Sequence, residues 1–252
     1  MGSPLRVMVT AGASGIGAAI ASRFAAEGAL VSVLDADPAA VSAVSGLHAV
    51  AGDCSDAAVV DAWFGDRLAA WGGLDVLVNN AGIAGPTAYV EDVSPEQWRQ
   101  TLAVGIDSHF LTSRRAAALM KAQGSGSIVA ISSTAGLYGY GMRSPYAAAK
   151  WAVIGLVKSL AIELGPHGVR VNAICPGSVD GPRMRGVIAR EAEGRGVEAS
   201  VVEQEYVQGQ SIHRFVAASE IADMAWFLAS PAASMVTGQA IAVDGHTETF
   251  HL

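Results

Sequence analysis

Tyr146 and Lys150, in the stretch "YAAAK", lie four residues apart at the start of an alanine-rich helical pattern. Residues i and i+4 share one face of a helix, so we expect both polar groups to meet the same surroundings. An ammonium near a phenol favours the phenolate, which lets a tyrosine exchange a proton with an alcohol or a carbonyl at neutral pH. Ser133, 13 residues upstream at the end of an apolar run, has a hydroxyl that can hydrogen-bond the oxygen of such a substrate. Together these three side chains predict acid–base catalysis on an alcohol or ketone.

The elements that must position these residues alternate regularly along the chain. We predict strands at 5–10, 30–35, 74–80, 127–132, 169–174 and 239–244, a third strand before Asp53, and helices at 15–28, 56–71, 105–122, 146–164 and 219–229. The strands are continuous apolar runs, as expected when helices cover both faces of a sheet. Regular β–α alternation predicts one α/β domain over residues 1–252, a doubly wound parallel sheet with helices on both faces. Ligands of such sheets bind at the carboxyl ends of the strands.

A glycine-rich turn follows the first strand and opens the first helix, in "TAGASGIG". Gly12, Gly15 and Gly17 allow a sharp turn and a close backbone approach to a ligand, and the helix N-terminus offers free N–H groups to phosphate. We therefore place a dinucleotide here, with Ser14 and Ile16 among its contacts; the alternative is a tight turn without a ligand.

Two acidic residues follow the next strands. Asp35 ends the second strand, 18 positions after Gly17, where a carboxylate binds ribose hydroxyls and repels a 2'-phosphate. This favours NAD over NADP, unless Asp35 merely caps a loop. Asp53, beside Cys54, is either a contact for the adenine or, like Ser55, an N-cap of the following helix.

Small residues after the fourth strand, in "NNAG", leave room for the cofactor to pass; the expected contacts are Asn80, Ala81 and Gly82.

Residues 181–212 interrupt the alternation with a long charged segment. Such a segment inside a compact domain is usually functional, and we predict one or two short helices that form a mobile cover over the substrate. Its Arg183, Arg185 and Arg190 either bind an anionic substrate or pair with glutamates of the same segment, namely Glu191, Glu193, Glu198, Glu203 and Glu205. Before Tyr146, Tyr138, Tyr140 and Met142 either line an apolar wall of the pocket or form a subunit contact.

Composition narrows the class of protein. The net charge is -7, half of the 252 residues are hydrophobic and 15% are charged, which disfavours a nucleic-acid or anionic-membrane partner. Cys54 and Cys175 are far apart and belong to no CxxC motif, so we expect neither a disulfide nor a metal site, and a reducing, cytoplasmic location. We expect no signal peptide and find no apolar run of membrane length.

The chain resembles the short-chain dehydrogenases/reductases over nearly its whole length. The resemblance lies in "TAGASGIG", Asp35, "NNAG", Ser133, "YAAAK", "CPGSV" and "TGQAIAVDG". It implies a Rossmann-type fold, NAD(P)-linked oxidation of alcohols or reduction of ketones, and a homotetramer. It also implies that Pro176, Gly177 and Val179 lie beside the nicotinamide, and that Lys150 holds the nicotinamide ribose.

Three positions depart from the family pattern. Ala11 replaces the first glycine of the turn, and we expect Gly12 to keep the backbone flexibility one place on. Gly181 stands where the family often has a threonine. Gly105 stands where the family has an asparagine that helps hold a water in a proton relay from the lysine. The nearby Asp107 and His109 either contribute to this relay or lie on the helix surface.

The main hypothesis is an NAD-dependent dehydrogenase of a small secondary alcohol, such as a sugar, a polyol or a cyclic alcohol. The Gly105 departure motivates an alternative, a non-catalytic NAD(H)-binding redox sensor. A reductase of a carrier-bound 3-oxoacyl group is a weaker alternative, because an acidic carrier needs a basic rim and this chain is net acidic.

Overall fold

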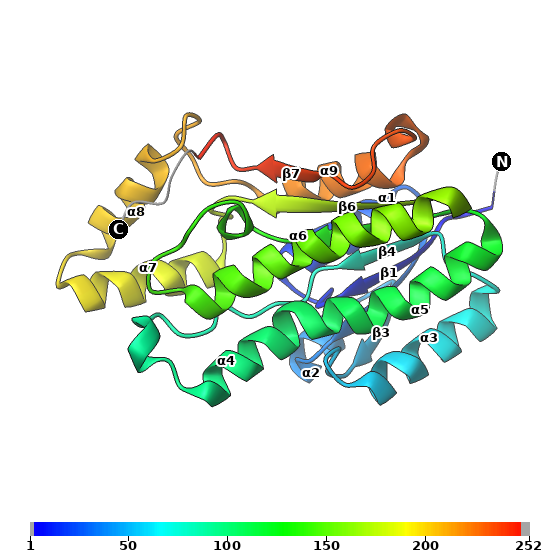
Figure 1. The fold of residues 1–252 in the computed structure, drawn as a ribbon, viewed down its shortest axis with the longest axis horizontal. Helices are drawn as coiled ribbons and strands as arrows, with labels where there is room; N and C mark the ends of the chain where they lie inside the picture. The colour runs from blue at the N-terminus through cyan, green and yellow to red at the C-terminus, as the bar shows by residue number, and fades with distance from the viewer. Residues whose placement is uncertain (1–2, 248–252) are drawn as a thin grey trace.

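The computed structural model describes residues 3–247. Within them, seven parallel strands form one sheet in the order β3-β2-β1-β4-β5-β6-β7 (Figure 1). The strands are β1 (Arg6–Thr10), β2 (Leu30–Asp35), β3 (His48–Ala51), β4 (Val76–Asn79), β5 (Gly126–Ile131), β6 (Val169–Pro176) and β7 (Ala240–Val243). The chain winds outward from β1 to one edge and then from β4 to the other, so the predicted doubly wound sheet is confirmed.

The described helices are α1 (Gly15–Ala26), α2 (Pro38–Ala43), α3 (Ala57–Trp71), α4 (Pro95–Leu102), α5 (Ser108–Gln123), α6 (Ser144–Leu164), α7 (Pro182–Arg195), α8 (Ala199–Gln208) and α9 (Ala218–Ala229). The five helices predicted outside residues 181–212 are confirmed, although the ends of some differ by a few residues. Helices α2 and α4 were not predicted. None of the helices in residues 3–247 is both long and apolar enough to span a bilayer.

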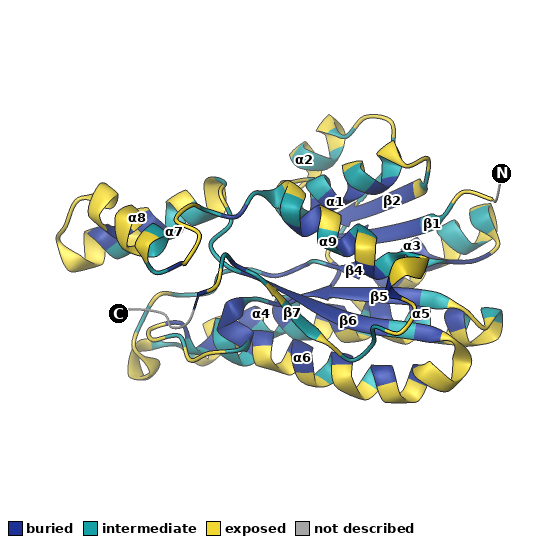
Figure 2. Cartoon of the chain, turned by 90° about the horizontal axis from the view of Figure 1, so that it is seen from above, coloured by how far each residue is buried: buried dark blue, intermediate teal, exposed yellow. Residues whose placement is uncertain are grey.

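Two apolar cores hold the layers together, one on each face of the sheet. Helices α1 and α9 bury Phe24 and Ile221 on one face, and α3, α5 and α6 bury Phe64, Met120 and Val157 on the other. Figure 2 shows α1 and α9 on one side of the strands and α5 and α6 on the opposite side. Each such side chain contributes roughly 1.5–3 kcal/mol of burial free energy, so the sheet is fixed rigidly and its strand ends form a stable platform.

Helices α4 and α5 follow each other without a loop, joined by the π-helical turn Ala103–Asp107. The helical path therefore begins ahead of the helix predicted at 105–122, because Ser94 caps α4 and exchanges capping-box hydrogen bonds with Gln97. A π-helical turn inserts an extra residue and often lies at a functional site. Here it faces the first turns of α6.

The segment between β6 and β7 folds into α7 and α8, which extend beyond the sheet at its carboxyl end (Figures 1 and 2). The prediction of helices in residues 181–212 is confirmed. Ile188, Ala192 and Val202 form a small core of their own, which is much smaller than the two main cores.

Candidate active site

The ends of β1 and β4 are tied together by polar contacts. Asn80 donates its side-chain amide to the carbonyls of Ala11 at 2.9 Å and Thr10 at 3.2 Å. In return, the hydroxyl of Thr10 accepts hydrogen bonds from the backbone N–H groups of Asn80 and Ala81. The glycine-rich turn and "NNAG" therefore form one rigid unit at the carboxyl edge of the sheet.

Crowding on the protein side dictates small residues in the glycine-rich turn. A Cβ on Gly17 would lie 2.1 Å from the carbonyl oxygen of Ala11, and one on Gly12 would lie 2.7 Å from the side chain of Val33. Gly15 instead has a φ of 53° and open space in place of a Cβ. Ser14 precedes α1, and its side chain makes no capping hydrogen bond. An open backbone face at a helix N-terminus fits the phosphates of a dinucleotide.

The expectation that Gly12 takes over the flexibility of the first glycine is wrong. Ala11 itself adopts the left-handed conformation, with a φ of 47°. Gly12 is required for another reason, its contact with Val33. An L-residue in this region is strained by roughly 1–2 kcal/mol, so the turn keeps its shape at the expense of stability.

The carboxylate of Asp35 lies beside this turn. One of its oxygens accepts from the backbone N–H of Ala13 at 3.0 Å and the other from that of Asp37 at 3.1 Å. Asp35 is 9% exposed, so its carboxylate orientation is fixed by the backbone around it.

After β3, the alternative that Asp53 or Ser55 caps the following helix is wrong. Asp56 caps α3, accepting from the backbone N–H groups of Ala58 and Val59. The exposed Asp53 instead accepts from the backbone N–H and hydroxyl of Ser55, both at 2.8 Å. Burial raises the pKa of the adjacent Cys54 thiol to about 11, so this thiol stays protonated at neutral pH.

Tyr146 and Lys150 lie on the first two turns of α6, which begins at Ser144. The ammonium nitrogen of Lys150 lies 5.8 Å from the ring centroid of Tyr146 and donates to the carbonyl of Ile131 at 2.9 Å. A Cβ on Gly82 would lie 3.1 Å from the same nitrogen. Gly82, the last residue of "NNAG", therefore lies against Lys150 and close to Tyr146, although the two motifs were predicted separately.

Ser133 follows β5 at the same edge of the sheet. Its hydroxyl oxygen accepts from the backbone N–H of Ala135 at 3.1 Å, which leaves the hydroxyl proton available to a substrate oxygen. The preceding Ser132 donates to the carbonyl of Lys150 at 2.8 Å. This buried contact fastens α6 to β5.

Lys150 is only 4% exposed. Burial, together with the smaller effect of the positive charge of Arg183, lowers the pKa of its ammonium to about 7. Of the three N–H donors on the ammonium, one is used by Ile131 within the described residues. The others remain for a ligand.

Pro176 is the last residue of β6, and Gly177 and Val179 follow it at this edge. Gly177 donates its backbone N–H to the carbonyl of Val243, and a Cβ on it would lie 2.8 Å from that of Asp244. Val179 pairs with Val216, on the chain that returns from α8. The backbone after β6 is therefore closely packed against residues 243–244 and Val216.

Gly105 is buried in the π-helical turn, against α6. A Cβ at this position would lie 2.8 Å from the Cβ of Ala149, between Tyr146 and Lys150. Glycine is thus needed for the close approach of these two helices. The asparagine that the family places here would therefore meet Ala149.

The alternative that His109 lies on the helix surface is wrong, whereas Asp107 is exposed, as the same alternative predicts. His109 is 1% exposed, and its Nε2–H donates to the carbonyl of Ala81 at 3.0 Å. Its Nδ1 has no hydrogen-bond partner within residues 3–247. Burial lowers the pKa of the imidazole to about 3, so it is neutral at physiological pH. No periodicity in the sequence distinguishes it from an exposed helical histidine.

For Arg183 and Arg185, the alternative of pairing with glutamates of residues 181–212 is wrong. Arg183 donates to the carbonyl of Gly82 at 2.7 Å, and Arg185 pairs with Asp180 at 3.0 Å. The glutamates Glu191 and Glu205 bind a different residue, Arg195.

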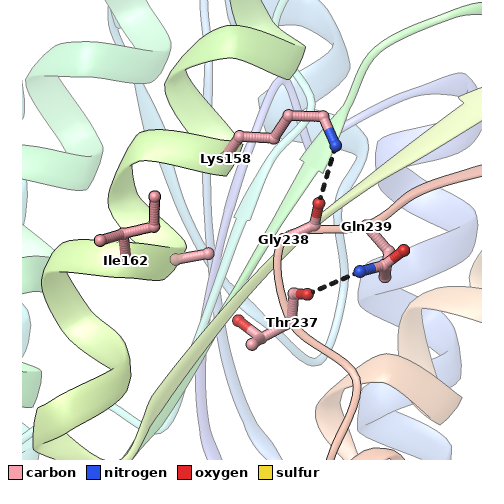
Figure 3. A pocket seen from close by; sticks show the side chains of 6 residues that line it. Lys158, Ile162, Thr237, Gly238 and Gln239 are labelled. Carbon is pink, nitrogen blue, oxygen red and sulfur yellow. Dashed lines mark hydrogen bonds between the residues drawn. The ribbon is translucent and has the colours of Figure 1, made fainter.

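The pocket drawn in Figure 3 lies away from the candidate active site. Lys158 and Ile162 of α6 line it together with residues 237–239, which precede β7. It is therefore at the amino end of β7, away from the strand ends that carry Ser133 and Asp35. The amine of Lys158 already donates to the carbonyl of Gly238 at 3.2 Å, and we assign this pocket no part in catalysis.

Comparison with known proteins agrees with this arrangement. The family model described as enoyl-(acyl carrier protein) reductase matches residues 10–246. D-beta-hydroxybutyrate dehydrogenase of Rhizobium meliloti (strain 1021) is 36% identical over 253 residues, covering 94% of this chain and 96% of the relative. Cis-4-hydroxycyclohexanecarboxylate dehydrogenase of Sinomonas cyclohexanicum is 38% identical over 245 residues, covering 94% of each chain. The crystal structure of NAD+-bound xylitol dehydrogenase superposes with a TM-score of 0.92 at 27% identity, covering 96% of this chain and 98% of the other.

The chain belongs to the short-chain dehydrogenase/reductase family. The predicted class of activity, an oxidoreductase that interconverts an alcohol and a ketone with a nicotinamide cofactor, is confirmed at this level. The alternative of a non-catalytic sensor finds no support among these relatives, which are named as enzymes.

Proposed function

We propose that the protein oxidises a small secondary alcohol with NAD, and that Ser133, Tyr146 and Lys150 are its catalytic residues. The observation that carries this proposal is the meeting of Gly82, Lys150 and Tyr146 described above. The relatives support the kind of substrate, because hydroxybutyrate, hydroxycyclohexanecarboxylate and xylitol all carry secondary hydroxyl groups.

In this mechanism, the hydroxyl of Ser133 donates a hydrogen bond to the substrate oxygen. The Tyr146 phenolate accepts the hydroxyl proton of the alcohol, and the ammonium of Lys150 stabilises the phenolate and binds the ribose next to the nicotinamide. A bound nicotinamide dinucleotide supplies the acceptor for the hydride that leaves the carbinol carbon. Ketone reduction is the same sequence reversed. With Gly105 in the relay position, only its backbone carbonyl is left there to hold a water.

The proposed cofactor site lines the carboxyl edge of the sheet. In addition to Tyr146 and Lys150, its proposed members are Gly12, Ser14, Gly15, Ile16, Gly17, Asp35, Asp53, Cys54, Asn80, Ala81, Gly82, Pro176, Gly177 and Val179. The position of the Asp35 carboxylate, next to the N–H of Ala13, supports a preference for NAD, because a 2'-phosphate there would meet a fixed negative charge.

The cofactor preference has its own test. Asp35→Ala should lower the ratio of kcat/KM for NAD over NADP by about 10-fold or more, as expected from losing one charged hydrogen bond. Asp37→Ala is the matched control, since Asp37 is exposed and caps α2. An unchanged ratio in Asp35→Ala would contradict the ribose assignment.

We also propose that residues 181–212 cover the substrate of a single catalytic domain, that the protein is a homotetramer, and that it is cytoplasmic. Exposed apolar side chains on α5 and α6, Phe110, Trp151 and Ile162, support an assembly through these helices. Two buried cysteines that form no disulfide support a reducing compartment. Analytical ultracentrifugation tests the tetramer.

The direct test is NADH formation with a panel of polyols, sugars, cyclic alcohols and hydroxy acids. Oxidation of at least one secondary alcohol is expected. Tight NAD binding without turnover of any member would contradict the proposal. Reduction of a carrier-linked 3-oxoacyl group in preference to all free ketones would favour the carrier alternative.

A further inference from the structure

Arg143 is a buried cation next to the proposed catalytic tyrosine. It is the last residue before α6, only 4% exposed, and three residues from Tyr146. Burying a guanidinium is costly unless it is paired. Yet within residues 3–247 no carboxylate forms an ion pair with it, and its Nε–H has no hydrogen-bond partner. Its Nη2 donates to the carbonyl of Ala84 at 2.8 Å.

The guanidinium lies against two aromatic rings. Its Cζ is 5.2 Å from the ring centroid of Tyr146 and 5.3 Å from that of Tyr140. Both are cation–π distances, so the two rings hold the cation in place. A positive charge is thereby fixed beside the ring whose hydroxyl we propose to exchange a proton with the substrate.

A second cation reaches the same loop from the cover. Arg183 of α7 donates to the carbonyl of Gly82, two residues before the carbonyl that binds Arg143. Two residues of extended chain span at most about 7 Å, so the two guanidinium groups are anchored close together. No ion pair to Arg183 occurs in the described part of the chain. Two cations without counter-charges thus converge beside Lys150 and Tyr146.

Hydrogen bonding to backbone carbonyls leaves most of this charge unneutralised. An arginine has five N–H donors arranged as a planar fork that matches a carboxylate. The carbonyls of Ala84 and Gly82 occupy one donor nitrogen of each guanidinium. The remaining donors and the unpaired charges are those expected of a receptor for an anion.

We propose that Arg143, with Arg183 beside it, binds a carboxylate of the substrate, so that the enzyme acts on hydroxy acids. This inference rests on the proposed function and narrows its substrate class. A purely structural Arg143, fastening the loop of residues 82–84 to α6, is the alternative that the experiment must separate.

The experiment compares pairs of probes that differ only in charge. 4-Hydroxycyclohexanecarboxylate and its carboxamide report turnover, while cyclohexanecarboxylate and its carboxamide, which lack the hydroxyl, report binding to the enzyme–NAD complex by calorimetry. The wild type should prefer each acid, and Arg143→Gln should lose roughly 10- to 100-fold in kcat/KM for the acid with little change for the amide. Arg143→Lys should recover part of the preference.

Further variants separate the roles of the cations. Arg183→Gln should weaken binding of the acid several-fold and leave NAD binding unchanged. Weaker NAD binding instead would assign Arg183 to the cofactor and remove it from the proposed carboxylate site. Arg185→Gln is the matched control, because Arg185 already pairs with Asp180 on the surface.

The outcomes also separate this inference from the proposed function. Equal use of acid and amide by the wild type, or an equal loss for both in Arg143→Gln, would overturn the anion site while alcohol oxidation stands. Binding of cyclohexanecarboxylate that depends on Arg143, without turnover of any alcohol, would keep the anion site and overturn the proposed function. Absence of acid binding would overturn the inference outright.

Discussion

Two regions of the site are built in different ways. The proposed nucleotide edge, comprising residues 10–17, Asp35 and residues 79–82, is shaped by backbone contacts that exclude larger side chains. The proposed substrate side, comprising the π-helical turn Ala103–Asp107, residues 133–143 and α7, includes a buried cationic side chain, Arg143. Backbone constraints demand particular residue types, so the first region is readable in sequence. Side-chain constraints depend on tertiary packing, so the second region is harder to read from the sequence.

Gly17→Ala tests whether the backbone excludes larger side chains from the proposed nucleotide edge. The added Cβ would lie 2.1 Å from a backbone oxygen, and neither α1 nor the turn can yield easily. We expect a loss of about 3 kcal/mol in unfolding free energy together with weaker NAD binding, measured by denaturant unfolding and calorimetry. Gly65→Ala, at an open position on α3, is the control and should be neutral or stabilising. A folded Gly17→Ala variant with normal NAD affinity would show that the edge is not backbone-limited.

The second test restores the family residue on the substrate side. In Gly105→Asn the side chain must displace Ala149, so we expect destabilisation of about 2 kcal/mol and lower kcat, because α6 carries Tyr146 and Lys150. Ala149→Gly in the same chain should recover part of both, as a double-mutant cycle would show. Higher activity in Gly105→Asn alone would mean that the relay, and not packing, limits this enzyme.

The third test uses the buried imidazole of His109. Its pKa is about 3 in the folded protein and near 6.5 in the unfolded chain. Between these values the unfolded chain binds a proton that the folded protein does not, so stability falls as the pH is lowered, by up to about 1.4 kcal/mol per pH unit. His109→Gln should flatten the pH dependence of unfolding between pH 6 and 4, with His213→Gln as the surface control. The same slope in His109→Gln would show that this histidine is not the group responsible.

The smallest effect is expected at Ala11. Ala11→Gly removes the strain of the positive φ but adds freedom to the unfolded chain, so we expect a net gain of about 0.5 kcal/mol. Thermal unfolding should show a rise of roughly 1–2 °C. A lower melting temperature would contradict the strained conformation.

The sheet, the main helices and the glycine-rich turn were predictable from the sequence. Continuous apolar runs indicate buried strands, and glycine is required where the backbone leaves no room for a Cβ. Helix α4 was missed although "SPEQ" contains the signals of its start, a capping serine, a following proline and a glutamine three residues on. Asp56, with no comparable pattern, was overlooked as the cap of α3. Helix caps of this kind can be predicted from the sequence, but they are easily missed when other candidate residues lie nearby.

Other parts of the site depended on contacts between distant segments. Gly105 was recognised as a departure from the family, yet its contact with Ala149 appears only when α6 packs against the π-helical turn. His109 and Arg143 are buried through contacts with Ala81 and Ala84, more than two dozen residues away in the chain. No window of sequence around either residue contains that information.

The central claim is that Tyr146 transfers the proton beside the bound nicotinamide, with Lys150 one turn along. It is tested most directly by the rate of NADH formation in Tyr146→Phe, compared with the wild type at saturating alcohol and NAD. The expected result is a loss of about 10²- to 10⁴-fold in kcat with an unchanged dissociation constant for NAD. A phenylalanine variant that keeps wild-type turnover would contradict the account.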